Sequence, residues 1–138
     1  MTRPQALIVD DEPDIRELLE LTLARMDVDS QQAASLEKAY EKLAAAKYQL
    51  CLADMRLPDG DGLELVEWMQ SHAAGVPVAV ITAHGNVETA VQALKLGAFD
   101  FISKPFQEVE VLARVRTHLA LRKMTLRSTP SPTFVRWD

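Results

Sequence analysis

Short apolar runs alternate with helical patterns along the chain, and this alternation constrains the fold more than any other feature. Five segments are candidate strands: residues 6–9, 28–33, 50–53, 78–82 and 99–102. The runs at 7–9 and 78–81 are apolar without interruption, as a strand covered on both faces requires. Five repeats of strand and helix predict an α/β fold built on a parallel sheet.

Five segments between and after the strands carry apolar residues at helical spacing. They are residues 13–26, 35–46, 62–72, 86–96 and 107–121. In the first, Pro13 stands where the opening turn of a helix tolerates proline. Ser35 and Asn86 are expected N-caps, and Gly97 is an expected C-terminal stop.

The length of 138 residues indicates one domain, and the 48% apolar and 25% charged fractions are those of an ordinary globular protein. Cys51 is the only cysteine, which excludes an internal disulfide and a cysteine-based zinc site. No run approaches the ~18 apolar residues that a membrane span needs. We therefore expect a cytoplasmic protein with no export or membrane signal.

Charge is divided unevenly along the chain. Residues 1–121 hold 11 Lys and Arg against 19 Asp and Glu, a net charge of −8, whereas residues 122–138 carry +3. The acidic body should repel nucleic acid. We expect the domain to span residues 1–122 and residues 123–138 to form a linker or a disordered tail. A DNA-binding arm is the alternative for the basic residues of that tail.

Polar residues follow four of the predicted strands. In an open parallel sheet, ligands bind at the carboxyl ends of the strands, and these ends carry Asp10, Asp11, Asp54, Thr82 and Lys104. Carboxylates within about 4 Å of one another repel by roughly 4 kcal/mol per pair, so the cluster needs a cation or raised pKa values. Ligands that are all oxygen favour Mg²⁺.

These groups are also suited to phosphoryl chemistry. The Asp54 carboxylate can attack phosphorus, while the Lys104 ammonium and the Thr82 hydroxyl can bind phosphoryl oxygens. Any one of them alone would more often be an ordinary turn or surface residue. Four loops that carry complementary groups at one edge of a sheet indicate a site.

From about residue 5 to residue 122 the sequence resembles the receiver domain of two-component response regulators. The motifs that carry the resemblance are LIVDDE at 7–12, DMRLPDGDG at 54–62, ITA at 81–83 and KPF at 104–106. It implies a flavodoxin-like (βα)5 sandwich of three layers, with a five-stranded parallel sheet of order 2-1-3-4-5.

The resemblance also implies a role for each matching residue. Asp54 is the expected phosphoacceptor, and Lys104 the expected phosphate-binding lysine. The expected ligands of Mg²⁺ are Asp10, Asp11, Asp54 and the backbone carbonyl of Arg56. The expected switch residues are Thr82 and Phe101, of which Thr82 should move toward the phosphoryl group while the Phe101 ring fills the vacated space.

A narrower resemblance is to the N-terminal receivers of NtrC-class activators of σ54-dependent transcription, carried by residues 54–58, 82–86 and 93–101. It implies a sensor histidine kinase as the phosphoryl donor and a transcription-activating effector, before which we expect this chain to end. It also implies a homodimer through the face made by the fourth helix, fifth strand and fifth helix. Direct binding to nucleic acid or to a membrane is not expected.

Such a domain would act only on its own phosphorylation and dephosphorylation and would not be a turnover enzyme. The main alternative is a pseudo-receiver that serves only as an interaction or dimerisation module. A phosphohydrolase is disfavoured because the D-x-D-x-T motif of one such family is absent. A flavodoxin-type FMN carrier is disfavoured because an acidic first loop would repel the phosphate of the cofactor.

Overall fold

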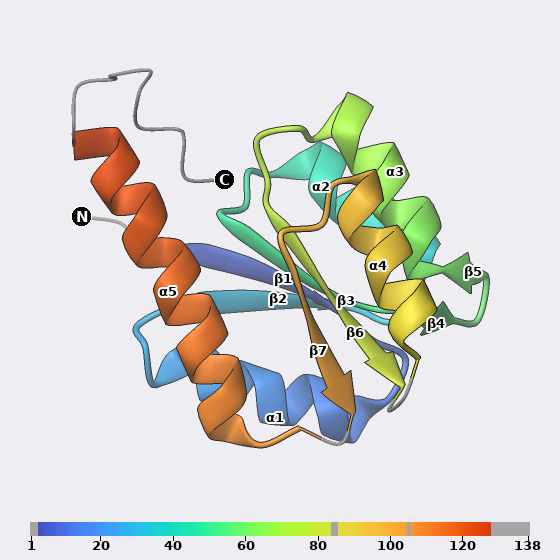
Figure 1. Cartoon of the computed structure of the whole chain (residues 1–138), viewed down its shortest axis with the longest axis horizontal. Coiled ribbons are helices and arrows are strands. Elements are labelled where there is room, and N and C mark those ends of the chain that lie inside the picture. The colour runs from blue at the N-terminus through green and yellow to red at the C-terminus, as the bar shows by residue number, and fades with distance from the viewer. Residues whose placement is uncertain (1–2, 84–85, 105, 128–138) are drawn as a thin grey trace.

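The computed structural model describes residues 3–83, 86–104 and 106–127. Its sheet consists of β1 (Gln5–Val9), β2 (Asp29–Ala33), β3 (Leu50–Asp54), β6 (Val78–Ala83) and β7 (Asp100–Lys104). The strands run parallel in the order β2-β1-β3-β6-β7 (Figure 1). This is the predicted order 2-1-3-4-5, because β6 and β7 are the fourth and fifth strands of the sheet.

The strand labels of the sheet jump from β3 to β6 because two short strands between them form a hairpin outside the sheet. The two-residue strands β4 (Arg56–Leu57) and β5 (Gly60–Asp61) pair antiparallel with each other. This hairpin connects β3 to the helix that follows. The strand pattern did not predict it, because two residues are too few to show a periodicity.

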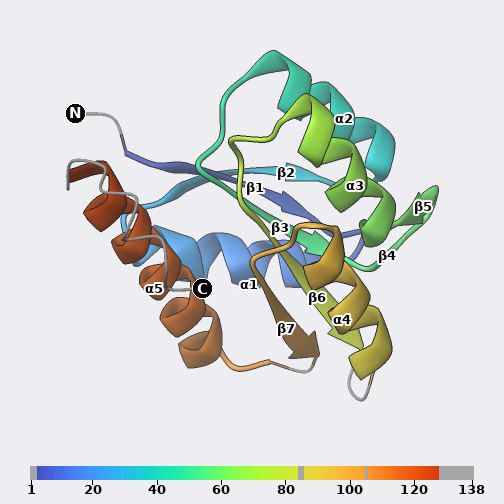
Figure 2. The same cartoon turned by 45° about the horizontal axis from the view of Figure 1, so that its top comes forward.

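Helices cover both faces of the sheet, which makes the predicted three layers. They are α1 (Pro13–Ala24), α2 (Leu36–Ala45), α3 (Gly62–His72), α4 (Val87–Leu96) and α5 (Glu108–Arg127). Helices α1 and α5 lie on one face, and α2, α3 and α4 lie on the other (Figures 1 and 2). The flavodoxin-like arrangement predicted from the sequence is confirmed.

The core is divided into two parts by the alternation of side chains along the strands. Leu7 and Cys51 point toward α2, α3 and α4, whereas the next residues, Ile8 and Leu52, point toward α1 and α5. All four side chains are fully buried. Strands buried on both faces explain the unbroken apolar runs, and they make the sheet a rigid platform for the loops at its carboxyl edge.

The expected helix ends are observed. The Ser35 hydroxyl accepts a hydrogen bond from the Lys38 amide at the start of α2, and the Asn86 side chain accepts one from the Thr89 amide at the start of α4. Gly97 ends α4 with a φ of 127°, a conformation that favours glycine. Local sequence therefore determines where α2 and α4 begin and where α4 ends.

The last helix is longer than predicted. We expected it to end at Leu121, but α5 continues to Arg127, into the segment that we expected to be a linker. Residues 122–127 contain no glycine or proline, and the first proline beyond them is Pro130, so nothing in their sequence stops the helix. Among the helices that the structure describes, none is long and apolar enough to cross a bilayer.

Candidate functional site

The register of the sheet brings the predicted site residues to one edge. Val9 pairs with Ala53, so Asp10, directly after β1, and Asp54, at the end of β3, lie at the same level. Asp54 in turn pairs with Ile81 on β6, and Ala83 pairs with Lys104 on β7. Residues far apart in the sequence therefore meet where the parallel strands end.

Lys104 is held by three carboxylates. Its Nζ lies 3.1 Å from Asp54 Oδ2, 2.9 Å from Glu12 Oε1 and 3.5 Å from Asp10 Oδ2. Burial by itself would lower the pKa of Lys104. The hydrogen bonds that the ammonium donates to Glu12 and Asp54, together with the negative charges of Asp54 and Asp10, outweigh burial and raise this pKa above its ordinary value of 10.5. The ammonium is therefore a permanent positive charge beside Asp54.

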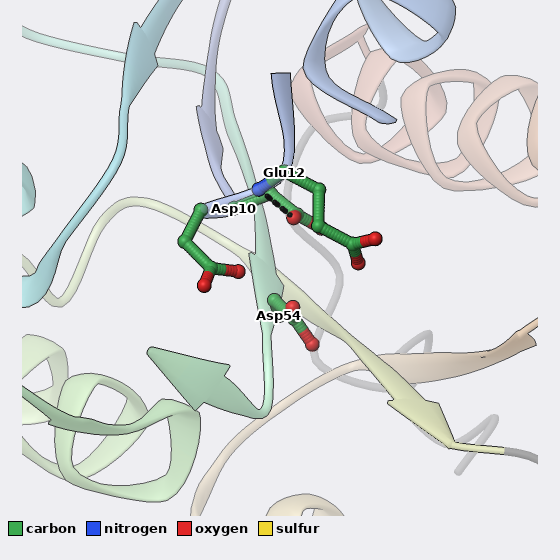
Figure 3. A group of neighbouring side chains, drawn as sticks. Asp10, Glu12 and Asp54 are labelled. Carbon is green, nitrogen blue, oxygen red and sulfur yellow. Dashed lines mark hydrogen bonds between the residues drawn. The ribbon is translucent and has the colours of Figure 1, made fainter. Parts of the chain in front are cut away.

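Four carboxylates form the acidic side of the site. Asp10, Asp11, Glu12 and Asp54 each present one oxygen, and these four oxygens lie within 4.8 Å of one another. Asp10 and Glu12 come from the loop after β1, and Asp54 comes from the end of β3 (Figure 3). Such a concentration of negative charge needs positive charge nearby, and Lys104 supplies only one.

Asp10 is the most deeply buried of these four residues. Its side chain is fully buried; Oδ1 accepts a hydrogen bond from the Glu12 amide at 2.9 Å, whereas Oδ2 has no hydrogen-bond partner. Burial raises the pKa of Asp10 above 3.8, the Glu12 amide opposes this, and the charge of Asp54 adds to it. A set of oxygen donors that includes a buried oxygen without a hydrogen-bond partner fits a hard divalent cation such as Mg²⁺.

Asp54 lies beside a cavity of about 430 Å³. Asp54 is 7% exposed, and its Oδ1 accepts a hydrogen bond from the Arg56 amide at 3.4 Å. The cavity is lined by Asp11, Glu12, Asp54, Met55, Arg56, Leu57, Pro58, Asn86 and Lys104. A small anionic group can therefore approach Asp54 between the acidic loop and Lys104.

Most of the predicted site residues are brought together, and two lie outside the group. The structure gathers Asp10, Asp11, Asp54, Arg56 and Lys104 as predicted. Thr82 and Phe101 lie outside this group.

Thr82 is buried on β6, one residue beyond the level of Asp54, and pairs with Ser103. Phe101 is half-buried on β7 and packs against the core on the side of α2, α3 and α4. Their coupled movement stays a prediction. The motif residues His84, Gly85 and Pro105 lie outside the described part of the chain.

Glu12 and Arg16 also contribute to the site, although no role was predicted for them from the sequence. Glu12 holds the Lys104 ammonium, as described above. Arg16 donates hydrogen bonds from Nη1 to the carbonyl of Asp10 at 2.8 Å and from Nε to Gln32 Oε1 at 3.0 Å. Its position four residues after Glu12, one helical turn away, was the signal that it could reach back to the acidic loop.

Replacement of Asp10 by Asn is expected to stabilise the metal-free domain by about 1 kcal/mol. It removes a buried charge whose Oδ2 has no hydrogen-bond partner and which is repelled by Asp54, and this outweighs the loss of the ion pair with Lys104. The pKa of Asp10 is raised in the folded state, so the neutral form of Asp10 contributes stability to the wild type. This contribution is fully present below pH 3.8 and is lost as the pH rises through the raised pKa. The variant should lack that loss. Urea unfolding of both proteins across this pH range, with chelator present, measures the difference; an Asn variant less stable than the wild type at pH 7 would contradict the prediction.

A family model described as the response regulator receiver domain matches residues 6–116. The chain is 52% identical to the response regulator protein PilR of Pseudomonas aeruginosa, in an alignment that covers 94% of this chain and 29% of PilR. It is 37% identical to the C4-dicarboxylate transport transcriptional regulatory protein DctD of the same organism, over 90% of this chain and 27% of DctD. The chain thus spans less than a third of the length of these relatives.

Solved structures give the same result. The crystal structure of NtrX from Brucella abortus superposes with a TM-score of 0.84 at 32% identity, over 90% of this chain and 28% of that chain. A CheY-like receiver domain protein from Methanospirillum hungatei superposes with a TM-score of 0.83 at 26% identity, over 88% and 98% of the two chains. The resemblance inferred from the four motifs, and its narrower form among NtrC-class regulators, are confirmed.

Proposed function

Since this chain belongs to the family of response regulator receiver domains, we propose that Asp54 accepts a phosphoryl group from a sensor histidine kinase and that this modification switches an effector. Receiver domains of response regulators take phosphoryl groups from histidine kinases. What we propose for this chain is which residues carry out the transfer, and that the domain catalyses only its own phosphorylation and dephosphorylation.

The observation that carries the proposal is the pairing of Asp54 with Lys104. The two side chains lie 3.1 Å apart beside the cavity, and Asp54 is almost fully buried among other carboxylates. An Asp54 oxygen attacks phosphorus and forms an O–P bond, while the P–N bond of the phosphohistidine breaks and the imidazole keeps the electron pair and takes up a proton. Lys104 is placed to bind the phosphoryl oxygens, and a rotation of the Thr82 side chain would let its hydroxyl donate to them.

The same residues account for a requirement for Mg²⁺. Asp10, Asp11, Asp54 and the backbone carbonyl of Arg56 would hold the ion, which supplies positive charge to a phosphoryl group in transfer. The carboxylate oxygens within 4.8 Å of one another, and the buried Asp10 oxygen that has no hydrogen-bond partner, support this assignment. Arg16 fixes the acidic loop through the Asp10 carbonyl, so the oxygens are arranged before any ion arrives.

We further propose which effector the phosphorylated domain controls and how the domain dimerises. DctD is described as a transcriptional regulatory protein, and the resemblance to NtrC-class receivers implies an effector that would activate σ54-dependent transcription. Phosphorylation would favour a homodimer through α4, β7 and α5. The exposed apolar side chains of Val87, Val91 and Leu94 on α4 support an interface there. Because the proposed kinase uses ATP, the proposal places the domain in the cytoplasm.

Phosphorylation by a small donor tests the proposal. Incubation with acetyl phosphate and Mg²⁺ should add one phosphoryl group, measured as a single mass increment on the intact protein, and the increment should disappear after brief treatment with hydroxylamine, which cleaves acyl phosphates. Excess EDTA should prevent the addition. A folded protein that acquires no phosphate would contradict the proposal and would favour a pseudo-receiver that acts only as an interaction module.

A further inference from the structure

The hairpin that follows Asp54 is tied to a helix from an earlier part of the chain. Asp59 lies in the turn between β4 and β5, and its carboxylate accepts two hydrogen bonds, from the Leu36 amide at 2.8 Å and from the Glu37 amide at 3.0 Å. Both amides belong to the first turn of α2. A carboxylate at this position satisfies amides that have no partner within the helix and meets the positive end of the helix dipole.

Packing at the same place is independent evidence for a close fit. Gly60 lies so close to the Leu36 side chain and the Glu64 carboxylate that a Cβ at position 60 would overlap both. Leu57, the partner of Gly60 in the hairpin, is 9% exposed. The hairpin therefore rests directly on the beginning of α2 and is held there by shape as well as by hydrogen bonds.

The contacts of Asp59 favour its ionised form. The hydrogen bond from the Leu36 amide is the largest influence on this carboxyl, and together with the one from Glu37 it keeps the pKa of Asp59 below its ordinary value. Asp61, two residues further on, differs in that it caps its own helix: its side chain accepts a hydrogen bond from the Glu64 amide at the start of α3. Of these two acids of the hairpin, Asp59 is the one that connects separate elements.

The anchored hairpin reaches the acceptor through its backbone. Arg56 opens β4, and its amide donates to Asp54 Oδ1 at 3.4 Å. The Gly62 amide donates to the Met55 carbonyl at 2.9 Å and closes the base of the loop. A displacement of the hairpin would therefore move the Arg56 backbone relative to Asp54.

We propose that Asp59 is a positioning residue for the site: by binding the first turn of α2 it fixes the hairpin and thereby holds the Arg56 backbone beside Asp54. The inference rests on the proposed function, because it matters for chemistry only if the Arg56 carbonyl is a ligand of Mg²⁺. It assigns a role to Asp59, which lies in the motif at 54–62 but has none of the roles that the family resemblance implies.

Replacement of Asp59 by Ala tests the inference. The dissociation constant for Mg²⁺, measured by isothermal titration calorimetry, should rise about tenfold, the lower end of the effect of losing a residue that orients a ligand. The backbone amide resonance of Arg56 in a ¹H–¹⁵N spectrum recorded without Mg²⁺ should also shift. Asp59→Asn keeps one acceptor oxygen and the shape of the side chain, so it should restore part of the affinity.

Ser35→Ala is the matched control. It removes the other side-chain acceptor at the same helix end, the one for the Lys38 amide, without touching the hairpin. It should cost about 1 kcal/mol of stability and leave both the Mg²⁺ dissociation constant and the Arg56 resonance unchanged. An equal effect of Ser35→Ala and Asp59→Ala on Mg²⁺ binding would show a general loss of stability and would overturn the inference.

Two further outcomes separate the inference from the proposed function. If the wild type binds Mg²⁺ and Asp59→Ala binds it within about twofold of the wild type, the positioning role is refuted while the proposed function stands. If the wild type does not bind Mg²⁺, the proposed function is contradicted, and the Arg56 resonance alone decides whether Asp59 positions the loop: a resonance that does not move in Asp59→Ala refutes the role.

Discussion

Replacement of Lys104 by Ala is expected to lower the free energy of unfolding by about 2 kcal/mol in the absence of divalent cations. The variant leaves the buried carboxylates of Asp10 and Asp54 without the charge that now pairs with them. Breaking a fully buried ion pair costs roughly 3 to 5 kcal/mol. The smaller figure applies because the Lys104 side chain is 23% exposed and the third partner, Glu12, lies at the surface. Urea unfolding at pH 7 with chelator present measures the change.

Two controls test whether the change in stability comes from the charge of Lys104. Lys95→Ala removes an exposed lysine from α4 and should change stability by less than about 0.5 kcal/mol. A cation that binds only the folded state stabilises that state. Mg²⁺ should therefore add more stability to Lys104→Ala than to the wild type, because the carboxylates of the variant have no lysine to neutralise them. A Lys104→Ala variant as stable as the wild type without metal would contradict the electrostatic description of the site.

The raised pKa of Lys104 also determines how the stability of the domain changes in alkaline solution. Because the pKa of Lys104 is raised in the folded state, the stability from its ion pairs is fully present below pH 10.5 and is lost as the pH rises through the raised pKa. The wild type should therefore lose stability in strongly alkaline solution by a component that Lys104→Ala lacks.

Replacement of Asp54 by Asn should abolish phosphorylation by acetyl phosphate and by a histidine kinase. The amide is nearly isosteric with the carboxylate but is a far weaker nucleophile, so the O–P bond cannot form at a comparable rate. The fold should be retained, because the loss of one carboxylate from a cluster of four relieves repulsion. Phosphate incorporation, followed by intact mass under conditions that label the wild type, measures the effect.

Asp61→Asn provides a matched control for this variant. It makes the same chemical change seven residues away, at the N-cap of α3, where the side chain accepts a hydrogen bond from the Glu64 amide. Asparagine is also a good N-cap, so this variant should fold and should be labelled as fully as the wild type. Labelling of Asp54→Asn at the level of Asp61→Asn would reject the acceptor assignment.

Most of the fold was predictable because its determinants are local. The apolar runs on β1 and β6 show strands buried on both faces, and the caps at Ser35 and Asn86 mark where helices begin. The convergence of Asp10, Asp54 and Lys104 was predictable as well, because the carboxyl ends of parallel strands meet at one edge of a sheet whatever the details of packing.

What the sequence did not indicate depends on contacts between distant residues or on individual rotamers. Asp59 finds its partners 22 and 23 residues earlier in the chain, and no pattern in the sequence indicates that pairing. The bond between Glu12 and Lys104 depends on two long side chains meeting across 92 residues of sequence. The extension of α5 was missed because prolines near the end of the chain gave the whole basic segment the composition of a linker.

Reductive trapping tests the central claim, that Asp54 is the acceptor, most directly. Sodium borohydride reduces an aspartyl phosphate to homoserine and leaves free carboxylates unchanged, so the reaction records the position of the acyl phosphate in the chain. After treatment with acetyl phosphate and Mg²⁺, peptide mass mapping should find homoserine at position 54 and at no other aspartate. Homoserine at position 10 or 11, or an unchanged Asp54 in protein that carries the label, would contradict the account.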